Sequence, residues 1–495
     1  MYGIRRLAAG AISFLALLVW ASPALAVRPD TTGWQELQSG AGHFDVHYPS
    51  SISTADAQTV VGNLEKAYSV EVGDWGFAPP ITNGSSKVDV YVTPLDANLG
   101  EASPDRVGPA TSGYIEIDPS AVDNGETAAH ELFHTLQYAL DSRGAKFLKE
   151  GTAEWAGANV AGNTSWLLSY WGAPDQPLDC VDGSACAQQG NAYARWLFFD
   201  YLSEGYGPGI IKEILSQAAL SDAGDDPAKD IQAIAAVLAN HGTSLTRVFN
   251  DFTAANLSGG YGFPGLASSG STPHSAWSTY TGATSMTLPT HTLAIDHLAA
   301  NYVDFYSGDP RVSAAGCGAS QLKISVDLPA GSSSVPSVKD AFGVKQLDVN
   351  GNTASATVPW TNCSGSVAGL ALPNPGNLDG QRFVVHASMK VTPVKQHATS
   401  APHIRVTFPK LAGAARRQQY LRFNVRSSGR GLLQALLKSG YVRGSYKLHK
   451  GVNKLRLRLP HTIKHGRRQF VLTAYSTTGR RGQTVRRHVL IRSAF

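Results

Sequence analysis

Two histidines four residues apart are the strongest chemical signal in this chain. His130 and His134 belong to the sequence H-E-x-x-H, in which Glu131 is the second residue. On a helix, residues four apart lie on one face, so both imidazoles can bind the same metal ion. The carboxylate of Glu131 can then reach a water molecule on the open side of that metal. This spacing predicts a zinc hydrolase in which Glu131 is the general base.

A third ligand is needed, because a catalytic zinc ion usually has three protein ligands and keeps one position for water. The sequence H-E-x-x-H-x-x-G-x-x-H is absent, since Gln137 and Leu140 occupy its Gly and third His positions. The other solution is a glutamate from a downstream helix. The segment E-G-T-A-E-W at 150–155 offers two candidates, Glu150 and Glu154, which lie one helical turn apart.

These two segments together resemble the gluzincins, in which a helix after H-E-x-x-H carries the third ligand. Secreted bacterial proteins of the peptidase MA-like group show H-E-x-x-H-x-x-Q and then E-G-x-A-x-W or E-G-x-A-E-Y. This chain has the matching Gln137 and the matching E-G-T-A-E-W. The resemblance covers about residues 40–240. It implies that Glu150 is the third ligand and that Glu154 accepts a hydrogen bond from a ligand imidazole.

The resemblance also implies roles for two further segments. Tyr193, in an apolar helix expected over 191–204, is similar to a Tyr that hydrogen-bonds the oxyanion in gluzincin aminopeptidases. A buried core Tyr is the alternative. His241 is another candidate oxyanion donor, although an exposed helix end is favoured there. The strand before the metal helix is an edge strand that pairs with extended peptide in that family, and the segment 113–117, with Tyr114, is the candidate.

Strands and helices must bring these residues together. Residue alternation predicts strands over 43–48, 87–92 and 112–117. Apolar periodicity predicts a helix over 53–72, the metal helix over 124–140, and an antiparallel second helix that carries Glu150. Further helices over 210–219, 230–240 and 245–256 complete an α-rich half.

The N-terminus has the pattern of a cleaved secretory signal. Arg5 and Arg6 precede an apolar run, and residues 24–26 read A-L-A, which predicts a mature chain from Val27. No later stretch has the ~20 apolar residues that a membrane-spanning helix needs. The signal and the family resemblance together indicate a bacterial protein that is secreted, extracellular or attached to the cell surface.

Four cysteines remain after the signal peptide: Cys180, Cys186, Cys317 and Cys363. An even number in an exported chain predicts two disulfides, with the local pairings Cys180–Cys186 and Cys317–Cys363. Neither pair has the spacing of a metal site.

The length of 495 residues allows two to four domains, and the pattern predicts an α+β protein. We expect a gluzincin-like metallopeptidase domain over 27–285. Alternating strands from about 292 to 393 predict a β-sandwich domain over 286–394. Alternation continues over 395–495, and the stretch from Gly451 to Gly482 resembles Ig-like modules of secreted bacterial proteins, which implies a basic Ig-like β-domain there.

The last domain has an extreme charge. Residues 395–495 contain 23 Lys and Arg and no Asp or Glu, which leaves 19 cations against all 37 acidic residues in the rest of the chain. The implied partner is a polyanion, such as a cell-wall polymer, an anionic lipid surface or an acidic polysaccharide. The alternative is a solvated domain. No specific nucleic-acid binding is expected, because there is no recognition helix and no aromatic stacking platform.

The combined interpretation is a secreted zinc metallopeptidase that cleaves a peptide or protein substrate. His130, His134 and Glu150 bind zinc, Glu131 is the base, and Tyr193 donates to the oxyanion. One alternative is an adhesion protein that carries an inactive or accessory metalloprotease fold on β-domains that bind a surface. Another is zinc-dependent hydrolysis of a bond other than a peptide, because the motif specifies the activated water better than the substrate.

Overall fold

The computed structural model describes residues 27–162, 174–180, 191–258, 275–279, 285–287, 290–307, 319–340, 342–361, 366–391, 402–407, 420–437, 442–458, 466–475 and 481–491. The expected signal peptide and Cys186, Cys317 and Cys363 lie outside these ranges. Both disulfides therefore stay predictions. Cys180, which lies within the described ranges, is buried. No helix in the described ranges is long and apolar enough to cross a membrane.

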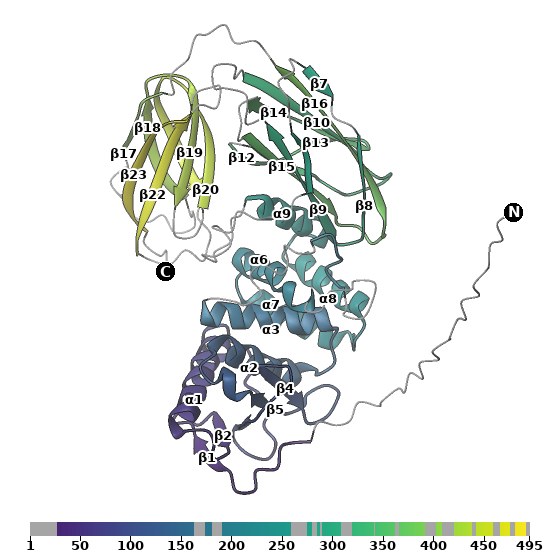
Figure 1. Ribbon diagram of the computed structural model, residues 1–495, viewed down its shortest axis with the longest axis vertical. Coiled ribbons are helices and arrows are strands. Elements are labelled where there is room, and N and C mark those ends of the chain that lie inside the picture. The colour runs from purple at the N-terminus through teal and green to yellow at the C-terminus, as the bar shows by residue number, and fades with distance from the viewer. Residues whose placement is uncertain are drawn as a thin grey trace, which may run out of the picture.

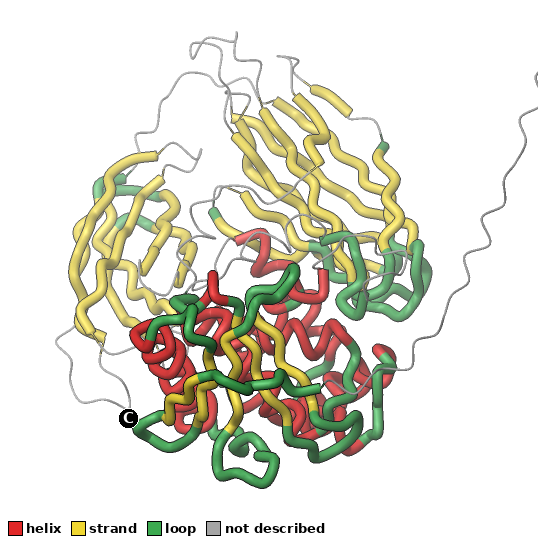
Figure 2. The backbone as a smooth tube through the Cα atoms, turned by 60° about the horizontal axis from the view of Figure 1, so that its bottom comes forward, coloured by secondary structure: helices red, strands yellow, loops and turns green. Residues whose placement is uncertain are grey.

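The chain combines helices with several sheets, and after helix α9 (Leu245–Ser258) its described elements are strands, as the α+β expectation requires. Figure 1 shows a small sheet at the bottom, a helical layer above it and two β-rich units at the top. The same two units appear in Figure 2 as separate groups of yellow strands beside the red helices.

The first sheet has the strand order β1-β2-β3-β5-β4. Its strands are β1 (Gln35–Gln38), β2 (Phe44–Tyr48), β3 (Val88–Val92), β4 (Gly100–Pro104) and β5 (Gly113–Ile117). Alternate strand residues such as Val88, Val90 and Val92 are buried against helices α1 (Thr54–Tyr68) and α2 (Gly125–Leu140). Helix α1 begins at Ser53, whose side chain accepts a hydrogen bond from the N–H of Asp56, and it continues into a π-helical turn, η1 (Ser69–Asp74).

The prediction that residues 113–117 form an edge strand is wrong. Strand β5 pairs in parallel with β3 on one side and antiparallel with β4 on the other. The edge strand on this side of the sheet is β4, which directly precedes β5 in the chain, and β1 is the edge strand on the other side. Its sequence, G-E-A-S-P, gave no strand signal, because Gly and Pro are depleted in strands and no β-branched residue is present. Proline is nevertheless tolerated in an edge strand, because its missing N–H removes no hydrogen bond between strands there.

Helix α2 lies between two hydrophobic cores. Ala128, Ala129 and Leu132 pack with the first sheet and α1, whereas Phe133 and Leu136 pack with the helices that follow. Those helices are α3 (Lys146–Ala161), α5 (Asn191–Ala194), α6 (Trp196–Tyr206), α7 (Gly209–Leu220), α8 (Pro227–Asn240) and α9 (Leu245–Ser258). The single helix expected over 191–204 is interrupted at Arg195. Burial on both sides makes α2 a rigid support for any side chain that it carries.

Two glycines allow α3 to lie close to its neighbours. A Cβ added at Gly157 would lie 2.9 Å from the backbone oxygen of Glu126 and 3.5 Å from the Cβ of His130. A Cβ added at Gly151 would lie 2.8 Å from the ring of Phe199 in α6. A side chain at either position would force α3 away from its neighbour. Glycine therefore allows α3 to pack closely against α2 and α6.

The middle β-rich unit consists of two sheets around one core, as a β-sandwich requires. One sheet has the order β13-β14-β10-β16-β7, with β8 also paired to β16, and the other has the order β12-β11-β15-β9-β6. Strand β6 (Ser275–Thr279) pairs with β9 (Ala299–Ser307), so this unit begins earlier in the chain than the expected boundary at 285. The remaining strands are β7 (Ser285–Thr287), β8 (His291–Ile295), β10 (Ala319–Asp327), β11 (Ser337–Asp340), β12 (Gly343–Gln346), β13 (Asp348–Asn350), β14 (Thr353–Thr361), β15 (Ser366–Asn374) and β16 (Gln381–Val391).

The last unit also has two sheets and a core of its own. The smaller sheet has the order β17-β18-β21, with β17 (Ile404–Thr407), β18 (Tyr420–Ser427) and β21 (Gly451–Arg458). The larger sheet has the order β20-β19-β22-β23, with β19 (Gly431–Leu437), β20 (Val442–Leu448), β22 (Gly466–Tyr475) and β23 (Arg481–Ile491). Strand residues such as Phe423, Val425 and Leu472 fill the core between the sheets.

The approach of α2 and α3 can be tested with two matched glycine variants. We expect Gly157→Ala to lower the free energy of unfolding by about 1–3 kcal/mol, because the added methyl group meets a backbone oxygen. Gly62→Ala in α1 should instead raise it by up to about 1 kcal/mol, since Gly62 is exposed and a Cβ there meets nothing. Denaturant unfolding followed by tryptophan fluorescence measures both. Equal stabilisation by the two substitutions would contradict the described packing.

Candidate metal centre

Helix α2 carries three of the expected functional residues. It begins at Asn124, whose side chain accepts hydrogen bonds from the N–H groups of Glu126 and Thr127. At its other end, the N–H groups of Ala110 and Thr111 bond the carbonyls of Leu140 and Tyr138. Both ends of α2 are therefore satisfied, and His130 and His134 project from its middle toward α3.

His130, His134 and Glu150 form a compact triangle of donor atoms that could hold a metal ion. The Nε2 atoms of the two imidazoles lie 3.1 Å apart, and Oε2 of Glu150 lies 3.4 Å from His130 Nε2 and 3.5 Å from His134 Nε2. Ligands at about 2.05 Å from a tetrahedral zinc ion would be about 3.3 Å apart. The spacing of the three atoms therefore fits one small tetrahedral ion bound by two nitrogens and one oxygen.

The other nitrogen of each imidazole has a partner that turns Nε2 toward this triangle. Nδ1 of His134 lies 2.7 Å from Oε1 of Gln137, and Nδ1 of His130 lies 3.3 Å from Oε2 of Glu154. Both partners are acceptors, so each Nδ1 carries a proton and each Nε2 is the atom that can offer its lone pair to a metal ion. Gln137 is itself held in place, since its Nε2 donates to the backbone oxygen of Lys149 and to Thr152 Oγ1.

The two candidate glutamates of α3 thus have different positions. Glu150 faces the Nε2 atoms of both imidazoles, whereas Glu154 lies on the Nδ1 side of His130 alone. This is the arrangement in which Glu150 is the ligand and Glu154 orients a ligand. Both carboxylates are buried or nearly so, and a buried charge needs such a partner.

The local charges act strongly on one another. Burial alone would lower the pKa of His130, but its hydrogen bonds with Glu150 and Glu154 and the charge of Glu131 raise it well above its ordinary value. Burial alone would raise the pKa of Glu150, but the charge of His134 and the bonds with both histidines hold it well below its ordinary value. The site is therefore built to bind a cation, which is a proton on His130 when no metal ion is bound.

Glu131 lies where the helix meets the edge strand. A Cβ added at Gly100 of β4 would lie 2.7 Å from Cγ and 2.9 Å from Oε1 of Glu131. The carboxyl of Glu131 also accepts a hydrogen bond from the N–H of Ala102 in the same strand. Burial raises the pKa of Glu131, and the charges of both histidines oppose this rise. The catalytic carboxylate expected from the sequence is thus buried between the metal ligands and β4.

Tyr193 lies against His130. Its ring stacks on that of His130, with 5.6 Å between the ring centroids. Burial and the charges of Glu150 and Glu131 raise the pKa of Tyr193, and its hydroxyl is hydrogen-bonded to Glu150. The hydroxyl therefore keeps its proton and remains a donor. His241, in contrast, follows α8 and is paired with Glu213 at 2.7 Å, which agrees with the exposed helix end that was favoured.

Two residues of the site were not anticipated from the sequence. Tyr138 of α2 stacks on His134 and donates its hydroxyl to the backbone oxygen of Ala102 at 2.7 Å. Glu71, in η1, is fully buried, and neither of its carboxyl oxygens has a hydrogen-bond partner among the described residues. Burial raises the pKa of Glu71 well above its ordinary value, and the charge of His130 only partly opposes this. The sequence does contain a signal for Glu71, because this charged residue lies between two valines in an apolar stretch.

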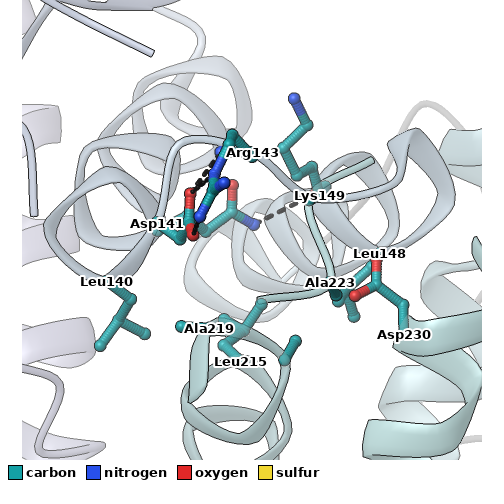
Figure 3. Close-up of a pocket in the computed structure, with 13 residues that line it drawn as sticks. Leu140, Asp141, Arg143, Leu148, Lys149, Leu215, Ala219, Ala223 and Asp230 are labelled. Carbon is teal, nitrogen blue, oxygen red and sulfur yellow. Dashed lines mark hydrogen bonds and ion pairs between the residues drawn. The ribbon is translucent and has the colours of Figure 1, made fainter. Parts of the chain in front are cut away.

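The structure also has a pocket near the candidate metal centre. It lies between the end of α2, the start of α3, and helices α7 and α8 (Figure 3). Asp141 and Arg143 form an ion pair in its wall, and Lys149 and Asp230 also line it. Gln137 reaches from this pocket to His134, but none of the three metal-binding candidates lines it. Asp230 supports the site indirectly, because its Oδ2 accepts the N–H of Ala145, the residue that begins α3.

Comparison with known proteins gives a match to one family model over part of the chain, and that model has no assigned function. A family model described as "Family of unknown function (DUF6055)" matches residues 37–252, a range that contains every residue of the candidate site. No curated protein matches the chain.

Two solved structures illustrate how remote the structural similarity is. The glycoside hydrolase domain of Endo-D from Streptococcus pneumoniae R6 has 11% identity and a TM-score of 0.18, over 40% of this chain and 32% of that one. A beta-1,2-glucanase from Parabacteroides distasonis has 12% identity and a TM-score of 0.12, over 41% of this chain and 36% of that one. The chain thus spans about a third of each, and these TM-scores are too low to bear on fold or function.

The different positions of Glu150 and Glu154 predict different effects on metal affinity. We expect the chain to bind one zinc ion, and Glu154→Gln to weaken binding by about 10-fold, because a neutral amide is a weaker acceptor for the Nδ1–H of His130 than the carboxylate. Glu150→Gln should weaken binding more, since it removes a ligand. Competition with a chromogenic chelator measures these affinities, and His241→Ala is a control outside the site. A larger loss for Glu154→Gln than for Glu150→Gln would reverse the two roles.

Asp230 predicts a pH dependence of stability. Burial raises the pKa of Asp230 to about 7, so the folded chain binds its proton more tightly than the unfolded chain does. Stability should therefore fall as pH rises from about 4 to about 7, because over this range the unfolded chain has released the proton of Asp230 and the folded chain still holds it. Asp230→Asn removes the ionisable carboxyl and, with it, this contribution to the pH dependence of stability. We expect unfolding curves of the two proteins to agree near pH 4.5 and the variant to be more stable by about 1–3 kcal/mol near pH 8.5. A difference that does not change with pH would contradict this.

Proposed function

We propose that this chain is a secreted zinc metallopeptidase of the gluzincin type. His130, His134 and Glu150 are the zinc ligands, Glu131 is the general base, and Tyr193 stabilises the oxyanion. Zinc is the metal we favour, because two imidazoles and one carboxylate in a tetrahedral arrangement are a typical donor set of catalytic zinc.

One observation carries the proposal: the metal-binding triangle, a buried carboxylate and the edge of a sheet meet at one place. Glu131 interacts with the charges of His130, His134 and Glu150, and it also contacts β4. A metal site that only stabilises the fold has no need of a free carboxylate beside it, and structural zinc usually has four protein ligands. Three ligands with an adjacent base are the arrangement of a hydrolytic site.

When bound, zinc would polarise the scissile carbonyl and lower the pKa of a water molecule toward ~7. Glu131 takes the proton from that water as the water oxygen attacks the carbonyl carbon. The same carboxyl then gives the proton to the leaving nitrogen as the C–N bond breaks.

Tyr193 and β4 would bind the other parts of the substrate. The hydroxyl of Tyr193 keeps its proton and can transfer its hydrogen bond from Glu150 to the developing oxyanion. Strand β4 is the edge of its sheet, and an extended peptide can add to such an edge through backbone hydrogen bonds. Gly100 has no side chain to separate that edge from Glu131. These features favour a peptide over a substrate that cannot adopt an extended backbone.

The central prediction concerns Glu131. We expect Glu131→Gln to keep one equivalent of zinc and to reduce cleavage of an unfolded protein such as casein by at least about 100-fold, because the amide cannot accept the proton. The measurement is zinc content by elemental analysis, together with the rate of peptide release from casein. Glu213→Gln, which neutralises a glutamate outside the site, is the control and should cleave at the wild-type rate.

Three outcomes separate the alternatives. Cleavage by Glu131→Gln at the wild-type rate would exclude Glu131 as the base. Zinc in every protein without cleavage in any would favour the adhesion protein or hydrolysis of another bond. Absence of zinc under conditions that load a control metalloprotease would contradict the proposed site itself.

A further inference from the structure

We infer that one face of the last β-rich unit binds a linear polyanion of the cell surface that carries phosphodiester groups. The face belongs to the sheet β17-β18-β21 and is formed by five exposed cations. We call it the cation face, and its residues are Arg405, Arg422, Arg426, Lys454 and Arg456.

Strand alternation places these cations on one side of the sheet. In β18, Arg422 and Arg426 are exposed, whereas Phe423 and Val425 between them are buried. In β21, Lys454 and Arg456 are exposed and Leu457 is buried. One side of this sheet is therefore the core of the unit, and the other side is covered by positive charge.

The strand register brings like charges directly opposite each other. Arg405 of β17 is the cross-strand partner of Arg426 in β18, and Arg422 of β18 is the partner of Arg456 in β21. Like charges at such positions destabilise a sheet. Natural sheets usually place opposite charges there, and residues 395–495 contain no Asp or Glu at all. This repulsion costs stability, and a bound anion would relieve it.

The cation face points away from the rest of the molecule. The described contacts between the two β-rich units involve the other sheet: Ser445 of β20 lies against Gly343, and Tyr475 of β22 meets the ring of Phe342. Figure 1 shows β19 and β20 on the side of the middle unit and β17 on the far side. The cation face is thus accessible to a large partner.

The spacing and the residue types indicate the chemistry of that partner. Neighbouring strands are about 4.8 Å apart and alternate residues along a strand about 6.8 Å apart, so the cations form a flat grid that suits an extended chain with repeated charges. Four of the five cations are arginines, whose planar guanidinium binds a phosphate through two hydrogen bonds.

Two other polyanions fit less well. Single-stranded nucleic acid is usually bound by aromatic stacking as well as by charge, and the exposed described side chains of this face include no aromatic ring. A membrane surface usually receives several apolar side chains, and among the described residues of this face Val452 is the one exposed large apolar side chain. A phosphodiester polymer outside the cell needs neither.

The charge of the remaining chain would fix the orientation on such a polymer. Residues before 395 hold 19 cations against 37 acidic residues, so that part carries a net charge of −18 and is repelled by a polyanion. The cation face would therefore contact the polymer while the candidate metal centre is directed away from it. This inference does not depend on the proposed peptidase activity.

The test is a titration of the full mature chain with poly(glycerol phosphate) at two salt concentrations. We expect binding that weakens at higher salt, and we expect Arg405→Gln/Arg426→Gln to raise Kd by about 10–30-fold. The matched control is Arg486→Gln/Arg487→Gln, which removes two exposed cations from β23 in the other sheet and should change Kd by less than about threefold.

A thermal unfolding scan guards against misfolding. Because Arg405 and Arg426 repel each other, their double Gln variant should unfold at the same temperature as the wild type or higher. If it does not fold, Arg405→Lys/Arg426→Lys keeps the charges, loses the bidentate geometry, and should raise Kd by a few fold.

Several results would overturn the inference. Equal weakening by the two double Gln variants would mean that net charge alone binds the polymer. Tighter binding of oligo(dT), of a carboxylated polysaccharide or of anionic vesicles than of poly(glycerol phosphate) would reject the phosphodiester polymer as the partner. Absence of binding by the wild type at low salt would reject the cation face as a binding surface.

Discussion

The close approach of α2 and α3 is the constraint on which the candidate site depends. All three metal-binding side chains come from these two helices, and two partners that orient the histidines, Gln137 and Glu154, come from them as well. Gly157 lets the helices touch, and Gln137 links them through Lys149 and Thr152. The cores on both sides of α2 then hold its side chains in one position, which is what a site with fixed ligand distances requires.

This arrangement is costly in the absence of a metal ion. Three carboxylates and two imidazoles lie in a largely buried space, and burial of charge is unfavourable unless each charge has a partner. The ion pairs of His130 with Glu150 and Glu154 offset part of the cost, as the opposite pKa shifts of His130 and Glu150 indicate. A divalent cation would replace the proton on His130 and satisfy all three ligands. Binding of metal should therefore also stabilise the fold.

The sequence was sufficient for the residues whose identity and spacing carry chemistry. The H-E-x-x-H helix begins and ends almost where its periodicity predicts, and the downstream glutamate could be found from E-G-x-A-E-W. The edge strand could not, because β4 becomes a strand through its pairing with β5 and not through its own residues. Tyr138 and Glu71 were missed for a related reason: an aromatic or acidic residue within an apolar helix looks like core or an exception until the fold shows what it faces. The pairing of arginine with arginine across strands likewise could not be predicted, because the strand register is known only from the structure of the sheet.

The most direct test of the central claim is anomalous diffraction from crystals of the mature chain grown with zinc, recorded on both sides of the zinc absorption edge. The account predicts one strong peak that disappears below the edge, at about 2.0–2.2 Å from Nε2 of His130, Nε2 of His134 and a carboxylate oxygen of Glu150. Glu154 should then remain bonded to Nδ1 of His130. A peak bound by Glu154 in place of Glu150, a peak at another site alone, or no peak at the histidines would contradict the account.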